Sequence, residues 1–309
     1  MQKWTRSRAL ALVTILHKHS DYEAAIEEIG ESKDAIYNAF KRFNLKPPTS
    51  YLGQGVERPK QAPGGWIKVL VSNDHHVPFH HVKGMENLLR FATIQQPDHI
   101  VFNGDFLDCY SISDFERAPG MPSLQDEIDA GSEILKGFRN ACPTAKMTYL
   151  EGNHEFRLER VVNRNPGFYN LKSLNIKSLL NLEEMDIDHL RYKEVLEIGP
   201  LAIKHGEAVS ASAGQTVQKE VLQRGFNHVI IGHVHRLGWI HKTGFSGAKQ
   251  GLENGGLFDK SQCHYNKNPD WQNGFCIAHV NVEEDKVHLE PIWMDQDGSF
   301  FHGGVYYPG

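Results

Sequence analysis

The chain has 309 residues, and 33 Lys and Arg against 38 Asp and Glu give it a formal net charge of −5. This mild negative charge excludes a uniformly basic protein that wraps nucleic acid, but it leaves room for a local basic surface. Hydrophobic residues make up 40% of the chain and charged residues 23%, a balance that is typical of a folded globular protein and excludes disorder throughout.

Residues 1–46 carry a helical pattern. Apolar side chains recur at helical spacing on both sides of a break at Gly30, and Ser32 is well placed to cap the helix that follows. A short helix, a glycine turn and a longer helix ending in Lys41-Arg42 resemble a helix-turn-helix module. A small helical bundle used for packing or dimerisation explains the same pattern, and both interpretations stay open. In a helix-turn-helix module, phosphate contacts would fall to Lys33, Lys41, Arg42 and Lys46.

Residues 47–65 are rich in proline and glycine, so we expect a linker there between two folding units. Charge also divides at this point. Residues 1–60 carry 10 Lys and Arg against 7 Asp and Glu, a net of +3, whereas the remainder carries 23 against 31, a net of −8. The basic part of the chain is therefore the part with the possible DNA-binding pattern.

From residue 66 onward, short β-rich runs alternate with helical patterns, which predicts an α/β domain over residues 66–309. Helical patterns separate the first three strands, and the stretch between residues 274 and 294 alternates as two further strands. The five strands that precede this stretch are predicted at residues 66–72, 99–103, 147–150, 201–204 and 228–231.

Each of these five strands is followed by residues that can bind a metal ion through oxygen or imidazole nitrogen. Because ligands of open α/β sheets collect at the carboxyl ends of the strands, we expect the five segments to meet. A turn or a helix cap explains any one of them, but chance poorly explains five in succession. The segments are Asp74-His75-His76, Gly104-Asp105-Phe106-Leu107-Asp108, Gly152-Asn153-His154-Glu155, His205-Gly206 and Gly232-His233-Val234-His235.

This set of motifs resembles the calcineurin-like metallophosphoesterases over about residues 69–235. The segments GDFLDCYSISDFER and GNHEFRLER, with DWQNGF at residues 270–275, look like a phage-encoded branch of that family. The resemblance implies a β-sandwich flanked by helices on both faces (αββα), with the N-terminal all-α module outside it. It also implies an enzyme that hydrolyses phosphoesters by attack of a hydroxide activated by two divalent metal ions.

The resemblance assigns the metal ligands position by position. One ion would be bound by Asp74, His76, Asp105 and His235, and the second by Asp105, Asn153, His205 and His233, with Asp105 bridging the two. Three oxygen ligands and four imidazoles without a thiolate suit Mn²⁺ first, with Fe, Zn²⁺ and Mg²⁺ as alternatives.

Three further residues are assigned to catalysis. His154 matches the family's catalytic histidine, which protonates the leaving oxygen or stabilises the developing charge. Asp108 would orient that imidazole and raise its basicity. Arg157, three residues after His154, would reach back to a substrate phosphate if a helix begins there. An arginine on the exposed side of a helix is the alternative for Arg157.

Three substrate classes compete: nucleic acid, small phosphate esters, and phosphoproteins. Protein phosphatases of the superfamily carry Gly-Asp-x-Val-Asp-Arg-Gly, whereas here Cys109-Tyr110 follows Asp108, which argues against phosphoproteins. The His233-x-His235 pair resembles the phosphodiesterase and nuclease branches. Together with the basic N-terminal segment, it favours a phosphodiesterase acting on DNA. The alternative is a phosphatase or phosphodiesterase of small molecules or nucleotides, whose N-terminal module serves oligomerisation.

Location and assembly are less constrained. The four cysteines lie far apart without a CxxC pair, which fits a reducing compartment. The longest apolar run, residues 9–16, is too short to cross a membrane. We therefore expect a soluble cytoplasmic protein without a membrane partner, in the host cell if the chain is phage-encoded. A homodimer is an open option because helix-turn-helix modules often work as pairs.

Overall fold

The computed structural model describes residues 64–114, 120–169, 171–223, 225–244, 247–262 and 270–309. The helical module predicted at residues 1–46 lies outside the described residues, together with residues 47–63 of the predicted linker. The four basic side chains predicted to contact nucleic acid, Lys33, Lys41, Arg42 and Lys46, also lie outside them.

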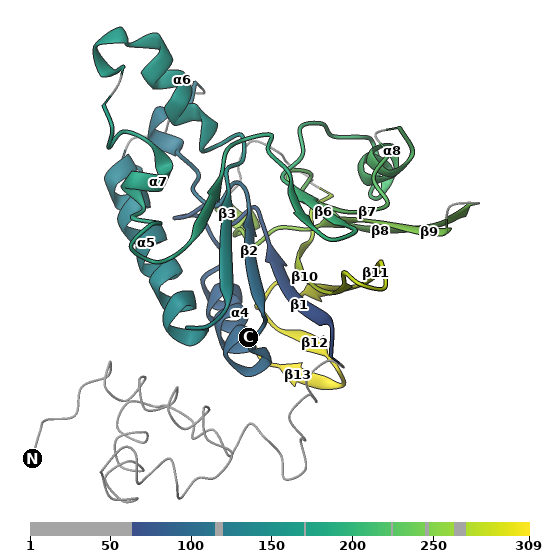
Figure 1. Ribbon diagram of the computed structural model, residues 1–309. Coiled ribbons are helices and arrows are strands. Elements are labelled where there is room, and N and C mark those ends of the chain that lie inside the picture. Colours follow the sequence, from purple (N-terminus) through teal and green to yellow (C-terminus); the bar gives the residue numbers. More distant parts are fainter. Residues whose placement is uncertain (1–63, 115–119, 170, 224, 245–246, 263–269) are drawn as a thin grey trace, which may run out of the picture. The chain divides into compact units, whose positions relative to one another are not determined.

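An eight-stranded mixed sheet forms one layer, in the order β13-β12-β11-β10-β1-β2-β3-β4 (Figure 1). Strands β1 to β4 run parallel to one another, and β10 joins them antiparallel beside β1. The parallel strands are β1 (Trp66–Ser72), β2 (His99–Asn103), β3 (Lys146–Leu150) and β4 (Asp188–Leu190). The antiparallel part consists of β10 (Asn273–Asn281), β11 (Lys286–Met294), β12 (Phe300–His302) and β13 (Val305–Tyr307).

A five-stranded sheet forms the second layer, in the order β5-β6-β7-β9-β8. Its three central strands are parallel, and the two edge strands are antiparallel to their neighbours. The strands are β5 (Leu196–Ile198), β6 (Leu201–Lys204), β7 (His228–Ile231), β8 (Leu237–Gly244) and β9 (Gly247–Asn254).

The two sheets pack face to face because their strands carry apolar side chains on both faces, as buried parallel strands do. Val69 and Val71 of β1 belong to the core between the sheets, together with Ile230 of β7. The flanking residues Val229 and Ile231 point to the opposite face, where they pack with residues of helix α8 (Gln215–Gln223). This alternation with period two places β7 between a sheet and a helix.

Helices cover the outer faces of both sheets: Figure 1 shows α4 (Val82–Gln95) and α5 (Leu124–Ala141) against the eight-stranded sheet and α8 against the other. Aromatic rings pack these helices against the eight-stranded sheet. The ring centroids of Phe91 in α4 and Phe275 in β10 are 5.3 Å apart, as are those of Phe138 in α5 and Phe102 in β2. The remaining helices of the described residues are α6 (Phe156–Arg164), α7 (Ile176–Leu179) and the short 3₁₀ helices η2 (Tyr110–Ile112), η3 (Pro166–Phe168) and η4 (Lys260–Gln262).

Helices on both faces of a two-sheet sandwich are the αββα arrangement that the family resemblance implies. Four of the five predicted strands coincide with β1, β2, β6 and β7, and β3 begins one residue earlier than predicted. Strands β8 and β9, which form a hairpin at the edge of the second sheet, were not predicted. No helix in the described part of the chain combines the length and apolar character that a membrane span requires.

Candidate metal centre

The loops that follow β1 and β2 are tied together by their backbones. The amide of Asp74 donates to the carbonyl of Gly104 at 3.0 Å, and the amide of His76 donates to the carbonyl of Asp105 at 2.9 Å. These bonds continue the pairing of two parallel strands beyond their carboxyl ends, which is where ligand sites of such sheets form. The first two motifs of the sequence therefore meet at one edge.

Five of the seven predicted metal ligands have left-handed backbone conformations. The φ angles are 51° for Asp74, 51° for His76, 47° for Asp105, 69° for His233 and 57° for His235. This conformation costs a residue with a side chain about 1–2 kcal/mol. Such strain persists where the surrounding structure enforces it, and it concentrates at functional sites.

Two motif glycines allow the loops to approach each other closely. A Cβ atom at Gly152 would overlap the side chain and the backbone nitrogen of Asp105, and one at Gly104 would overlap the imidazole of His205. Gly104 also has a positive φ of 81°. Only glycine fits both requirements at residue 104, which explains the Gly-Asp pair of the second motif.

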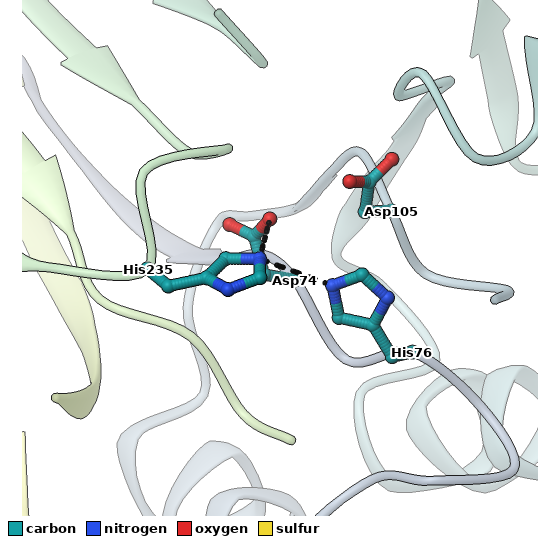
Figure 2. Close-up of side chains that lie close together, drawn as sticks. All are labelled: Asp74, His76, Asp105 and His235. Carbon is teal, nitrogen blue, oxygen red and sulfur yellow. Dashed lines mark hydrogen bonds and ion pairs between the residues drawn. The ribbon is translucent and has the colours of Figure 1, made fainter. Parts of the chain in front are cut away.

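Asp74, His76, Asp105 and His235 bring one ligand atom each to within 4.8 Å of one another. Figure 2 shows the imidazoles of His76 and His235 turned toward each other, with the carboxylate of Asp74 beside them. The two Nε2 atoms are 3.1 Å apart, and Nε2 of His235 is 3.2 Å from Oδ1 of Asp74. Donor atoms that surround one ion at bond lengths of about 2.0–2.2 Å have such separations. The four residues therefore fit a single metal ion.

Asp105, His205 and His233 form a second such group, also within 4.8 Å. Nε2 of His205 lies 3.2 Å from Oδ2 of Asp105 and 3.3 Å from Oδ1 of Asn153. Because Asp105 belongs to both groups, its carboxylate lies where a bridging ligand must lie. The structure thus brings together all seven predicted ligands, in the two sets that the resemblance implies.

The carboxylates at the centre are buried and ionised. Asp74 is fully buried, and burial raises its pKa, but His235 and His205 lower it more strongly, to about 2. His205 in turn has its pKa raised to about 10: burial lowers it, and Asp105 and Asp74 more than compensate. Two buried anions that are balanced by protons on histidine fit a place that cations occupy.

The outer nitrogens of two ligand histidines, His76 and His205, are held by hydrogen bonds. Nδ1 of His76 lies 2.9 Å from Oδ2 of Asp108, and Nδ1 of His205 lies 2.9 Å from the carbonyl of Asn103. The side-chain Nδ2 of Asn73 donates to Oδ2 of Asp74 at 2.5 Å. These contacts orient the ligands and leave Nε2 of both imidazoles facing the centre.

Asp108, His154 and Arg157 form one cluster beside this centre. Nδ1 of His154 lies 2.8 Å from the carbonyl oxygen of Asp108 and 3.4 Å from its carboxylate. Arg157 donates to the same carbonyl at 2.8 Å, and its Nη2 lies 3.2 Å from Nε2 of His154. Burial lowers the pKa of His154, but Asp105 and Asp108 raise it to about 9. The closest partner of the Asp108 carboxylate is His76, so Asp108 serves two histidines.

Comparison with known proteins identifies this arrangement. Residues 67–237, more than half of the chain, match the calcineurin-like phosphoesterase family. The chain belongs to this family. It is therefore an enzyme that hydrolyses phosphoesters with the help of divalent metal ions.

The Gene 54 proteins of Mycobacterium phages L5 and D29 are 27% and 26% identical to it over 244 and 242 residues. Each alignment spans 73% of this chain and 93% of the phage protein, which supports a phage-like branch of the family. The crystal structure of Chaetomium thermophilum Vps29 matches 76% of this chain and 94% of its own, with 10% identity and a TM-score of 0.40.

Among the arginines of the phosphoesterase's helix α6, only Arg157 turns to the metal centre. The helix begins at Phe156, so Arg157 reaches back across its first turn, and its side chain is only 14% exposed. Arg160 and Arg164 instead form ion pairs with Asp114, each at 2.6 Å, on the exposed surface. Arg160 and Arg164 therefore lie on the exposed side of the helix, which was the alternative for Arg157, whereas Arg157 itself does not.

Glu155 has a structural role that the sequence analysis did not assign. Its buried carboxylate accepts hydrogen bonds from the amides of Asp105 at 3.1 Å, Leu107 at 2.9 Å and Gly152 at 2.7 Å, and from the hydroxyl of Tyr149 at 2.8 Å. One side chain thereby joins the loops after β2 and β3. Its place directly after His154 in the third motif is the only signal in the sequence.

Two aromatic rings beside the first ligand set, those of Phe258 and Trp271, were also not predicted from the sequence. The ring of Phe258 lies 4.5 Å from that of His235 and 5.6 Å from that of His76, and Trp271 lies 5.0 Å from His235. These rings pack against the imidazoles on the side of the first ligand set. Trp271 belongs to the DWQNGF segment, which the sequence analysis noted only as a resemblance.

Other histidines near the first motif have structural roles. His75 is buried between Phe102 and Phe106, with ring centroids 6.0 and 4.9 Å away. His81 is the N-cap of α4, where its Nδ1 accepts from the amide of Gly84 at 2.9 Å. Neither residue lies within the two ligand sets.

Proposed function

We propose that the chain is a binuclear metallophosphodiesterase that cleaves nucleic acid, with DNA as its substrate. The observation that carries the binuclear part is that Asp105 belongs to two groups of residues whose ligand atoms lie within 4.8 Å of one another. The His233-x-His235 pair supports a diesterase, because each histidine of the pair contributes to a different set. The sequence Asp108-Cys109-Tyr110 departs from the protein-phosphatase pattern, which supports a substrate other than phosphoprotein.

Two bound divalent ions, of which Mn²⁺ suits the ligands best, would supply positive charge beside the scissile phosphate and lower the pKa of a water. His154 lies next to this centre, with Nδ1 held by the carbonyl of Asp108, and would give a proton to the leaving oxygen. Arg157 offers a planar guanidinium that can bind a phosphate oxygen. Asp108 keeps His76 and His154 in orientation from one position.

DNA is proposed as the substrate for two reasons: the catalytic side chains are open to solvent, and the N-terminal segment is basic. The side chains of His154 and Arg157 are 17% and 14% exposed, so both can be reached from solvent. The segment of residues 1–60 has a net charge of +3, which can hold a polyanion near a catalytic part whose own net charge is −8. Bound cations and Arg157 would reduce that repulsion locally.

The proposal is tested with three substrates in the presence of Mn²⁺: DNA, bis-p-nitrophenyl phosphate and p-nitrophenyl phosphate. We expect hydrolysis of both diesters and little of the monoester. Activity on the monoester alone would overturn the diesterase, and activity on the small diester without DNA cleavage would favour the alternative, a small-molecule phosphodiesterase.

The role of the N-terminal segment is tested in the full chain by replacing its four predicted phosphate contacts with alanine. We expect weaker DNA binding with a smaller salt dependence, while turnover of bis-p-nitrophenyl phosphate stays unchanged. The variant carries K33A, K41A, R42A and K46A. A matched control removes four lysines that are exposed in the catalytic part, Lys83, Lys136, Lys172 and Lys286. Equal effects of both variants would contradict a DNA-binding role for the N-terminal segment.

A further inference from the structure

Glu127 is a buried acid behind the catalytic cluster. It lies on the first turn of α5 and is fully buried. Within the described residues, no lysine or arginine forms an ion pair with it, and its Oε2 has no hydrogen-bond partner. Burying a carboxylate without a cation is costly, so its place calls for an explanation in terms of what it contacts.

The carboxylate of Glu127 holds the backbone that follows Asp108. Its Oε1 accepts a hydrogen bond from the amide of Tyr110 at 3.0 Å, and the amides of Cys109 and Ser111 also stabilise its charged form. Cys109 has a left-handed conformation, with φ 50° and ψ 39°, and provides no side-chain cap for η2. Glu127 thus satisfies the free amides at the start of this short helix.

Asp108, which directly precedes this segment, makes the contacts that hold the catalytic cluster together. The carbonyl of Asp108 accepts from His154 and Arg157, both at 2.8 Å, and its carboxylate contacts Nδ1 of His76 at 2.9 Å. A shift of this backbone would move both contacts together. A displacement of about 1 Å in a catalytic group can cost a factor of about 10² in rate.

We propose that Glu127 is a positioning residue, which fixes the segment of residues 108–111 from α5 and so holds His154 in line with the leaving oxygen. This inference rests on the proton-donating role proposed for His154, but not on DNA as the substrate. In the described residues Glu127 contacts none of the seven ligands itself, and Asp108 contacts His76 through Nδ1, whereas Nε2 of that ring faces the metal centre, so we expect metal binding to be kept.

The test compares E127Q with the wild type on two small diesters in the presence of Mn²⁺. Bis-p-nitrophenyl phosphate has a good leaving group, and diphenyl phosphate has a poorer one that needs more help from a proton donor. We expect E127Q to lower kcat for diphenyl phosphate by about 10²-fold and for the p-nitrophenyl ester by only a few-fold, with KM and bound Mn²⁺ unchanged. E127D keeps the carboxylate but places it one methylene further from the backbone amides, so its kcat for diphenyl phosphate should lie between those of E127Q and the wild type.

The matched control is E253Q. Glu253 is also a fully buried carboxylate that accepts from backbone amides, those of Gly214 at 2.8 Å and Thr216 at 2.9 Å, but it caps α8. We expect E253Q to lower Tm without changing the ratio of the two kcat values. An E127Q protein that loses Tm but keeps that ratio, or that loses Mn²⁺, would overturn the inference. A wild type inactive on both diesters would instead count against the proposed function.

Discussion

The Nε2 atoms of His76 and His235 lie 3.1 Å apart, although 159 positions separate the residues in the chain. Two imidazole nitrogens at this distance repel each other unless a proton or a cation lies between them. Nε2 of His235 also lies 3.2 Å from Oδ1 of Asp74 (Figure 2). The outer nitrogen of His76, Nδ1, contacts Asp108, so the inner nitrogens of both rings converge with a carboxylate oxygen. This convergence is the geometric basis of the metal centre.

Replacement of Asp105 by asparagine should remove both metal ions, because this carboxylate belongs to both ligand sets. We expect metal content to fall from about two Mn²⁺ per chain to below one, and turnover of a small diester to fall by about 10³-fold or more. Added Mn²⁺ should raise the Tm of the wild type and not that of the variant, since binding to the folded state stabilises it. The control is Asp114→Asn, which removes an exposed carboxylate; a fully active D105N protein would refute the assignment.

His154→Gln separates proton transfer from metal binding. Loss of a proton donor typically costs about 10²–10⁴-fold in rate, so kcat should fall by that factor. Metal content should remain at the wild-type level, because His154 contacts Asp105 only through its backbone amide at 2.8 Å and a long side-chain contact at 3.8 Å. Metal analysis beside steady-state kinetics checks both expectations, and unchanged kcat would remove His154 from the reaction.

Glu155→Ala should destabilise the fold as well as the site. The change deprives three backbone amides and the hydroxyl of Tyr149 of their acceptor in a buried environment. Groups left unsatisfied in this way cost about 1–3 kcal/mol each before relaxation, and we expect a loss of about 3 kcal/mol in the free energy of unfolding. Denaturant titration measures it, with exposed Glu159→Ala as the control. A loss below about 1 kcal/mol would contradict the structural role.

His99 should make stability depend on pH. Burial and the nearby Lys146 lower the pKa of His99 to about 4, and its Nε2 contacts the hydroxyl of Thr148 at 2.8 Å. The unfolded chain therefore takes up a proton below about pH 6.5 that the folded chain takes up only near pH 4, so the free energy of unfolding falls as the pH falls through this range. We expect about 2 kcal/mol of this fall to disappear in H99Q. Denaturant titrations at about pH 7.5 and about pH 4.5 compare the two proteins, and equal pH slopes would contradict it.

The sequence by itself determined the strands and the residues at their ends. Runs such as Trp66–Ser72 are read from local composition, and the motifs after them are short, so no long-range information was needed. Ligands collect at the carboxyl ends of parallel strands, which is why these motifs were expected to meet. The family resemblance then assigned the seven ligands and divided them into two sets, and the folded chain brings these residues together.

Only the tertiary structure decided which other side chains support the site. Glu155, Glu127 and Phe258 act through contacts with residues distant in sequence or with backbone amides, and such contacts leave no periodic pattern. The direction of Arg157 also depended on where α6 begins and on the carbonyl of Asp108 beside it. Local preference sets the strands, but the orientation of a side chain depends on what the folded chain brings next to it.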